Sequence, residues 1–214
     1  MSATVPAMPR RRSRSSRPPQ TVKASLCATC LVDQFFPEVG VAAVQTLEKA
    51  GVAVDFPEGQ TCCGQVAFNG GFQTEATEVA KGFLEVFDGV GYVVVPSGSC
   101  ASMIKVYYLE LFKDDPVLLD RAEKLSERTH ELSEFLANVV GSEQVTASYQ
   151  GTVTYHDACH LLRELGVSNE PRELVAQVSG AELVEMTDSD RCCGFGGLLS
   201  IKYPDISTAI LDEK

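Results

Sequence analysis

Eight cysteines lie along this 214-residue chain, and six of them form two sets of three with nearly the same spacing. Cys30 and Cys62 are 32 positions apart, and Cys159 and Cys192 are 33 apart. Each interval ends in Cys-Cys-Gly, at residues 62–64 and again at residues 192–194. Scattered core cysteines would not share both an interval and a triplet, so the spacing indicates an internal duplication.

Thiolates in this pattern suit metal chemistry. They are soft ligands for iron–sulfur clusters or zinc. Adjacent cysteines point in different directions and can both bind one multinuclear cluster, whereas a single zinc ion more often takes Cys-x2-Cys pairs. The glycine after each pair leaves room for a metal core and for N–H groups that point at sulfur. The spacing therefore favours a cluster over zinc.

Alternating strands and helices must bring these cysteines together. In the first copy an apolar helical pattern ends at Gly51, and alternating apolar residues at 52–56 predict a strand before Cys62. A helix pattern over 76–87 and a buried strand over 91–96 then lead to Cys100. The second copy repeats the order, with predicted elements at 151–155 (strand), 171–178 (helix) and 183–186 (strand).

This order predicts an α/β fold made of two pseudo-symmetric, Rossmann-like βαβ halves with parallel sheets. Cys30, Cys100 and Cys159 each follow a predicted strand. Ligands of parallel sheets bind beyond the carboxyl ends of the strands, so we expect these cysteines to meet at one edge.

The predicted organisation has four parts. Residues 1–23 form a disordered basic tail, 24–104 the first Cys-Cys-Gly domain, 105–150 a helical linker, and 151–214 the second Cys-Cys-Gly domain. In the first copy Cys100 follows Cys63 by 37 positions, so its counterpart would fall near position 230. We therefore expect the second half to be truncated.

Charge and hydropathy exclude some functions. The chain has a formal charge of −11, and six of its basic residues lie within 1–23, so residues 24–214 carry −17. Such an acidic body disfavours nucleic-acid binding. No apolar run is long enough for a membrane span, and the tail lacks the apolar core of a secretory signal. We expect a cytoplasmic protein.

Several motifs resemble the cysteine-rich iron–sulfur proteins with paired Cys-Cys-Gly domains. These include the cysteine-rich component of heterodisulfide reductase, the glycolate oxidase iron–sulfur subunit and the lactate-utilisation protein A group, which the chain resembles most. The resemblance covers residues 24–214 and is carried by Thr29–Asp33, Phe36–Gly40, Pro57–Gln65, Pro96–Cys100, Tyr155–His160 and Arg191–Gly197.

The resemblance implies specific ligands and partners. Cys30, Cys62, Cys63 and Cys100 would hold one iron–sulfur cluster, of the [4Fe–4S] type, and Cys159, Cys192 and Cys193 would begin a second site. It also implies electron transfer in a complex that oxidises L-lactate to pyruvate, with other iron–sulfur and accessory subunits as partners. The chain would then be a component of an oxidoreductase rather than a stand-alone enzyme.

Alternative functions fit parts of the same pattern. The reductase likeness allows a thiol–disulfide redox subunit, and the cysteines alone allow a zinc-stabilised scaffold, zinc at the second site only, or a truncated remnant. Cys27 and Cys30 have redox-active spacing, although we favour Cys27 as an incidental strand residue. His156 and His160 flank Cys159 and could replace a ligand, but we favour orienting or capping roles.

Overall fold

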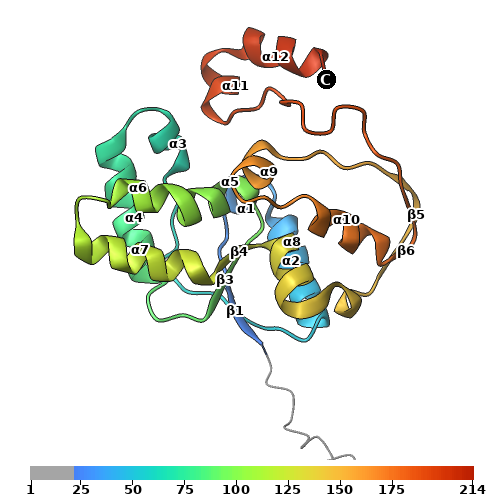
Figure 1. Ribbon diagram of the computed structural model, residues 1–214, viewed down its shortest axis with the longest axis horizontal. Helices are drawn as coiled ribbons and strands as arrows, with labels where there is room; N and C mark the ends of the chain where they lie inside the picture. The colour runs from blue at the N-terminus through green and yellow to red at the C-terminus, as the bar shows by residue number, and fades with distance from the viewer. Residues whose placement is uncertain (1–21) are drawn as a thin grey trace, which may run out of the picture.

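Two parallel sheets organise the computed structural model, which describes residues 22–214 (Figure 1). The first sheet has the strand order β2-β1-β3-β4, and the second pairs β5 with β6. The predicted α/β class with parallel sheets is therefore confirmed. The basic tail, up to residue 21, lies outside the described residues. The strands are β1 (Lys23–Leu26), β2 (Ala53–Asp55), β3 (Tyr92–Val95), β4 (Thr129–Glu131), β5 (Ala147–Val153) and β6 (Val178–Leu183).

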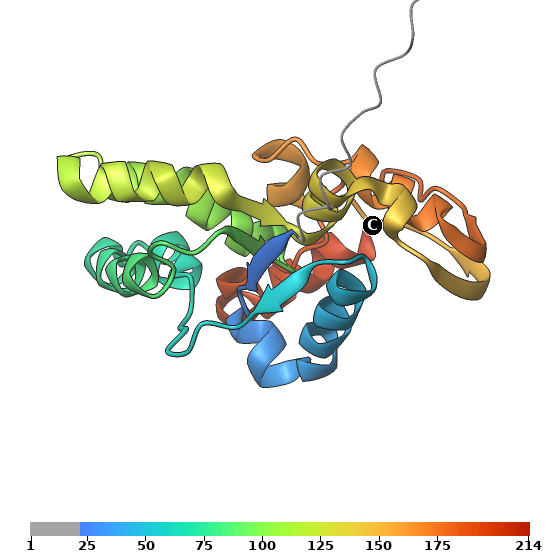
Figure 2. The ribbon, with the colours of Figure 1, turned by 90° about the horizontal axis from the view of Figure 1, so that it is seen from below.

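The valines of β3 explain why the first sheet is covered on both faces. Val93 and Val95 pack with the helices over residues 73–86 and 98–128, whereas Val94 packs with Leu47 and Phe135 on the other face. Successive side chains of a strand point to opposite faces, so a run of valines serves both layers. Figure 2 shows the green and yellow-green helices on one side of the strands and the blue helices on the other.

Helices connect the strands of the first half, and two of them begin at recognisable signals. Pro37 opens α2, and Pro116 opens α7, where the Asp115 side chain accepts hydrogen bonds from two backbone N–H groups. The helical elements are α1 (Cys30–Phe35), α2 (Pro37–Lys49), α3 (Gln65–Asn69), α4 (Gln73–Val86), α5 (Gly98–Ser102), the π-helix η1 (Met103–Tyr107), α6 (Tyr108–Leu111), α7 (Pro116–Arg128), α8 (Leu132–Glu134), the π-helix η2 (Phe135–Gly141) and the 3₁₀-helix η3 (Ser142–Gln144).

The second half repeats the element order of the first. In each half a strand is followed by two helices, a second parallel strand, a Cys-Cys-Gly triplet and two further helices. This matches the duplication inferred from the cysteine spacing. The helices of the second half are α9 (Cys159–Arg163), α10 (Asn169–Ala176), α11 (Leu198–Lys202) and α12 (Pro204–Asp212).

Residues 105–150, for which the sequence predicts only a helical linker, also contribute to the first sheet. β4 pairs with β3, and Ala122 and Leu125 of α7 are buried in the core. Thr129 is fully buried, and its hydroxyl donates to the Leu125 carbonyl at 2.7 Å. This hydrogen bond satisfies the polar group of Thr129 within the core. Within residues 22–214, no helix combines the length and apolar character needed to cross a membrane.

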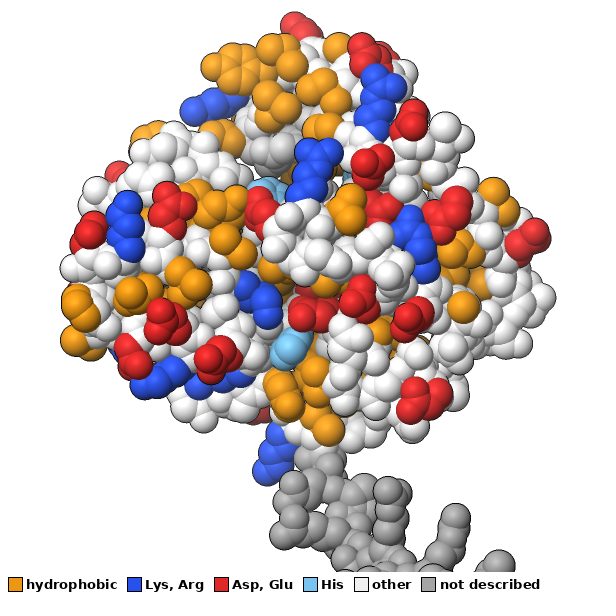
Figure 3. All heavy atoms as spheres, viewed as in Figure 1, with side chains coloured by type: hydrophobic (Ala, Val, Ile, Leu, Met, Phe, Trp, Pro, Cys, Tyr) orange, Lys and Arg blue, Asp and Glu red, His pale blue; other side chains and the backbone are white. Residues whose placement is uncertain are grey.

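Acidic and basic side chains are interspersed on the face shown in Figure 3, with hydrophobic side chains between them. The hydrophobic groups at the top of this view belong to the C-terminal segment, where Ile201, Ile206 and Leu211 are exposed. These residues lie on α11 and α12, which pack against each other. The last two helices therefore leave an apolar surface uncovered.

Candidate cysteine cluster

Four cysteines of the first half converge from three segments. Cys30 begins α1 after β1, and Cys100 lies in the first turn of α5 after β3. Cys62 and Cys63 lie in the loop between β2 and α3. The Cys30 and Cys62 sulfurs are 3.7 Å apart, and Cys63 lies close enough to both Cys62 and Cys100 to shift the pKa of each. Thiol contacts thus link the four side chains in the order 30, 62, 63, 100.

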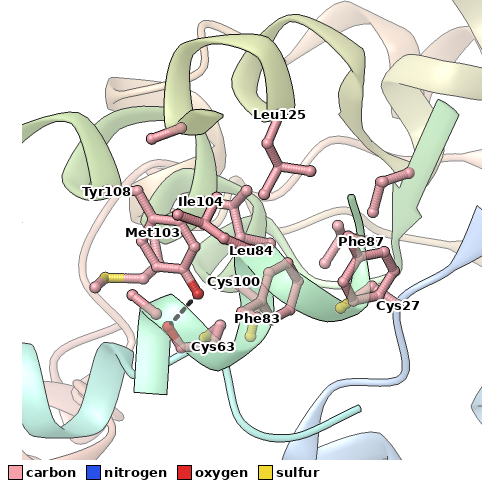
Figure 4. Packing of buried hydrophobic residues seen from close by; sticks show 14 of the residues in the cluster. Cys27, Cys63, Phe83, Leu84, Phe87, Cys100, Met103, Ile104, Tyr108 and Leu125 are labelled. Atoms are coloured by element: carbon pink, nitrogen blue, oxygen red, sulfur yellow. Dashed lines mark hydrogen bonds between the residues drawn. The ribbon is translucent and has the colours of Figure 1, made fainter. Parts of the chain in front are cut away.

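One end of this thiol chain is buried and the other is open. Cys63 and Cys100 are only 4% and 7% exposed and pack among aromatic and aliphatic side chains (Figure 4). Cys30 and Cys62 are half-buried and border a cavity of about 400 Å³. The other residues that line this cavity are Ala28, Asp33, Gln34, Phe56, Gly59, Gln60 and Thr61.

The glycine of the triplet shapes the loop around sulfur. Gly64 has φ +86°, a left-handed conformation that glycine adopts without strain, and its N–H donates to the Cys62 sulfur at 3.4 Å. A Cβ at this position would lie 3.3 Å from the Ala76 carbonyl of α4. The Tyr108 hydroxyl donates to the Cys63 carbonyl at 2.9 Å and secures the loop from inside (Figure 4).

The four thiols differ in the direction in which their surroundings shift the pKa. A hydrogen bond from Cys63, helped by the Gly64 N–H, lowers the pKa of Cys62 to about 5. Cys63, Ser97 and Ser99 together lower the pKa of Cys100. Burial and the neighbouring Cys62 raise the pKa of Cys30 to about 11. The pKa is therefore lowered at Cys62 and Cys100, and thiolate is the form that binds metal.

Cys27 lies close to these thiols, although its sequence position suggests only an incidental strand residue. It directly follows β1, is 2% exposed, and donates its backbone N–H to the Val94 carbonyl at 2.9 Å. Burial raises its pKa well above the usual value, and the nearby charges of Cys100, Cys62 and Cys30 add to the shift. The position of Cys27 directly after a buried strand is the sequence signal that could have predicted its place beside the other thiols.

The second half forms a partial copy of this arrangement. Cys159 begins α9, and its thiol lies near that of Cys192, as Cys30 lies near Cys62. Gly194 has φ +77°, and its N–H donates to the Cys192 sulfur at 3.4 Å. Cys193 is half-buried and Cys192 is exposed, so this site is more open than the first. Burial is the main cause that raises the pKa of Cys159.

An ion pair that the sequence pattern does not reveal ties the loops of the second site together. Asp157 is 4% exposed and binds Arg172 through both carboxylate oxygens at 2.7 and 2.8 Å. It also accepts from the Ser189 hydroxyl at 2.7 Å, which connects the Cys159 loop to the Cys192 loop. His156 Nδ1 lies 2.8 Å from the Ser189 carbonyl oxygen, so this histidine also contacts the loop that leads to Cys192.

The two halves meet where α5 packs against α9. The Glu164 carboxylate, directly after α9, accepts from the Tyr107 hydroxyl at 2.6 Å and from the Ser102 hydroxyl. His160 Nδ1 lies 2.9 Å from the same carboxylate. Gly98 of α5 sits directly against Leu161 of α9. The helices that carry Cys100 and Cys159 are therefore held in contact.

All eight cysteines are free thiols. Across residues 22–214, no group of three or more His, Cys, Asp or Glu side chains is arranged to hold a metal ion. The cysteines instead form the chain of four thiols in the first half and the Cys159–Cys192 pair in the second.

Comparison with known proteins gives consistent matches. The family model described as "Cysteine-rich domain" matches residues 25–105 and 153–214, which are the two repeats. Lactate utilization protein A 2 of Bacillus cereus (strain Q1) is 45% identical over 193 residues, which cover 90% of this chain and 80% of the relative. Lactate utilization protein A of Geobacillus kaustophilus (strain HTA426) is 48% identical with the same coverage.

Proposed function

We propose that this chain is an iron–sulfur electron-transfer component of L-lactate oxidation to pyruvate. The chain belongs to the cysteine-rich domain family, and its relatives include proteins named lactate utilization protein A. In this proposal Cys30, Cys62, Cys63 and Cys100 bind one cluster, of the [4Fe–4S] type. The second set, Cys159, Cys192 and Cys193, contributes to a second site. Other iron–sulfur and accessory subunits would pass electrons to and from this chain.

The observation that carries the proposal is the chain of four thiols. Three segments bring them together after parallel strands, where such sheets bind ligands. Cysteine sulfur is the donor that iron–sulfur clusters require. Cys30, Cys62, Cys63 and Cys100 would hold the cluster, since an iron–sulfur cluster takes its protein ligands from several thiolates.

A bound cluster would supply reversible one-electron transfer. The chain's own residues would set its surroundings. Phe83 and Tyr108 pack beside the buried sulfurs and exclude water, and the Gly64 N–H donates to the Cys62 sulfur. Cys30 and Cys62 face the open cavity, so the electron path to a partner would leave on this side.

The direct test uses the complex assembled anaerobically with its partner subunits. Addition of L-lactate should reduce the cluster on this chain, detected by electron paramagnetic resonance, as pyruvate forms. A centre that stays oxidised while pyruvate accumulates would refute the electron-transfer role.

Matched variants identify the ligands. Cys63→Ala should remove most of the iron from the first site and stop lactate-dependent reduction. Cys27→Ala is the control, because Cys27 is buried as deeply but lies outside the proposed ligand set. Equal iron loss in both variants would contradict the assignment.

A further inference from the structure

Two glutamines flank the first Cys-Cys-Gly triplet and bind two different cysteine loops. Gln60 donates through Nε2 to the Leu26 carbonyl and accepts at Oε1 from the Ala28 N–H, both at 2.9 Å. Gln65 donates through Nε2 to the Ser99 carbonyl at 3.0 Å. These bonds connect residues 32 to 34 positions apart, so they link loops rather than neighbours.

Gln60 acts as a short extension of the sheet. Its two bonds go to residues on either side of Cys27, just where β1 ends at Leu26. A side-chain amide has one carbonyl and one NH₂ group, so it can replace the backbone pairing that a neighbouring strand would supply. The bonds hold the segment that leads to Cys30 against the loop of Cys62.

Gln65 holds the third cysteine loop. It begins α3 directly after Gly64, and the carbonyl that it binds belongs to the residue before Cys100. The Cys100 N–H donates to the Ser97 hydroxyl at 3.4 Å, so this loop is fixed on both sides. The triplet is therefore tied by Gln60 to the Cys30 loop and by Gln65 to the Cys100 loop.

We propose that Gln60 and Gln65 are positioning residues that set the separations between the triplet's thiols and those of Cys30 and Cys100. They act through the backbone of the ligand loops, because the hydrogen bonds of both amides go to backbone atoms. The inference rests on the proposed function, because the separations of the thiols would fix the geometry around a bound cluster.

The second half lacks both glutamines. Asp190 and Phe195 occupy the equivalent positions beside Cys192-Cys193-Gly194, and Phe195 is 52% exposed. Its loops are joined by Asp157 and Ser189 instead. Two sites that share a triplet are therefore held by different contacts, so the glutamines are specific to the first site.

The test uses the full chain reconstituted anaerobically with iron and sulfide. Gln60→Ala, Gln65→Ala and Gln60→Met should each alter the electron paramagnetic resonance spectrum of the reduced protein. Loss of iron to a chelator should become about 10-fold faster, the lower end of the effect of removing contacts that orient metal ligands. Gln60→Met keeps the side chain's length without its hydrogen bonds. Gln45→Ala, on the exposed face of α2, is the control and should behave as wild type.

The possible outcomes distinguish the positioning role from the proposed function. An iron-containing wild type whose glutamine variants keep its spectrum and rate of iron loss would refute the positioning role. Variants that lower only the melting temperature of the apoprotein would refute it as well. A wild type that binds no iron and sulfide would refute the proposed function and this inference with it.

Discussion

Gly98→Ala should destabilise the contact between the two halves. Gly98 opens α5, and a Cβ built there would lie 2.7 Å from Leu161 Cβ and 3.3 Å from Leu161 Cα. Carbon atoms in contact normally sit about 3.5–4.0 Å apart. Both Leu161 atoms are at the base of the side chain, so no rotamer change relieves the clash. α9 must retreat by about 1 Å.

The expected cost follows from this overlap. Overpacking of a close contact costs about 1–3 kcal/mol, whereas the better helix propensity of alanine returns less than about 1 kcal/mol. We expect a net loss of about 1–2 kcal/mol in the free energy of unfolding. In a chain of this size, each kcal/mol lowers Tm by about 2–4 °C.

Urea unfolding of the apoprotein, followed by circular dichroism, measures the effect. Gly82→Ala is the matched control, because Gly82 lies inside α4 and a Cβ there would meet nothing within 4 Å. The control should gain about 0.5–1 kcal/mol through helix propensity. Equal gains in both variants would refute the close approach of α5 and α9.

Three further predictions concern stability. Arg172→Ala should cost about 3 kcal/mol by urea unfolding, because buried Asp157 would lose its charged partner. Gly64→Ala should cost about 1–2 kcal/mol, because φ +86° strains any residue with a Cβ, and differential scanning calorimetry should show a lower Tm. Burial alone would raise the pKa of Glu164, but hydrogen bonds from Ser102, Tyr107 and His160 outweigh it and lower the pKa. The carboxylate therefore stabilises the fold at neutral pH, and this contribution should be lost as the pH falls from the ordinary glutamate pKa of about 4.3 through the lower pKa of the folded state.

Each of these has a control. Lys124→Ala breaks the exposed Lys124–Asp120 pair and should change stability by less than about 0.5 kcal/mol, so an equal loss in Arg172→Ala would contradict the burial argument. Gly71→Ala has a similar φ of +82° but an open surrounding, so it isolates backbone strain from the contact with Ala76. Glu164→Gln should flatten the acid limb of the stability profile, and an unchanged limb would show that Glu164 does not contribute to it.

Patterns along the chain were enough to predict the α/β class. The valine run of β3 and the repeated cysteine intervals record local periodicity and duplication, and both are visible in one sequence. β4 was missed because Thr129–Glu131 is short and polar, and its strand conformation comes from pairing with β3. The parallel register of a three-residue segment depends on a partner more than 30 positions away.

The sequence alone also does not predict the side-chain contacts that hold the loops of the site together. In the sequence Gln60 and Gln65 are polar residues of the Pro57–Gln65 motif, and only the fold shows which backbone groups their amides bind. Asp157 and Arg172 lie 15 positions apart, on a loop and a helix that pack together only in the folded chain. The cysteines could be identified without the structure, because their residue type and their spacing are visible in the sequence.

The central claim is that four thiols of the first half bind iron and sulfide. The most direct measurement is quantitation of both elements in protein purified without oxygen, on wild type and on Cys63→Ala. We expect iron and acid-labile sulfide in equal amounts in the wild type and a clear loss of both in the variant. Colourless wild-type protein without either element would contradict the claim.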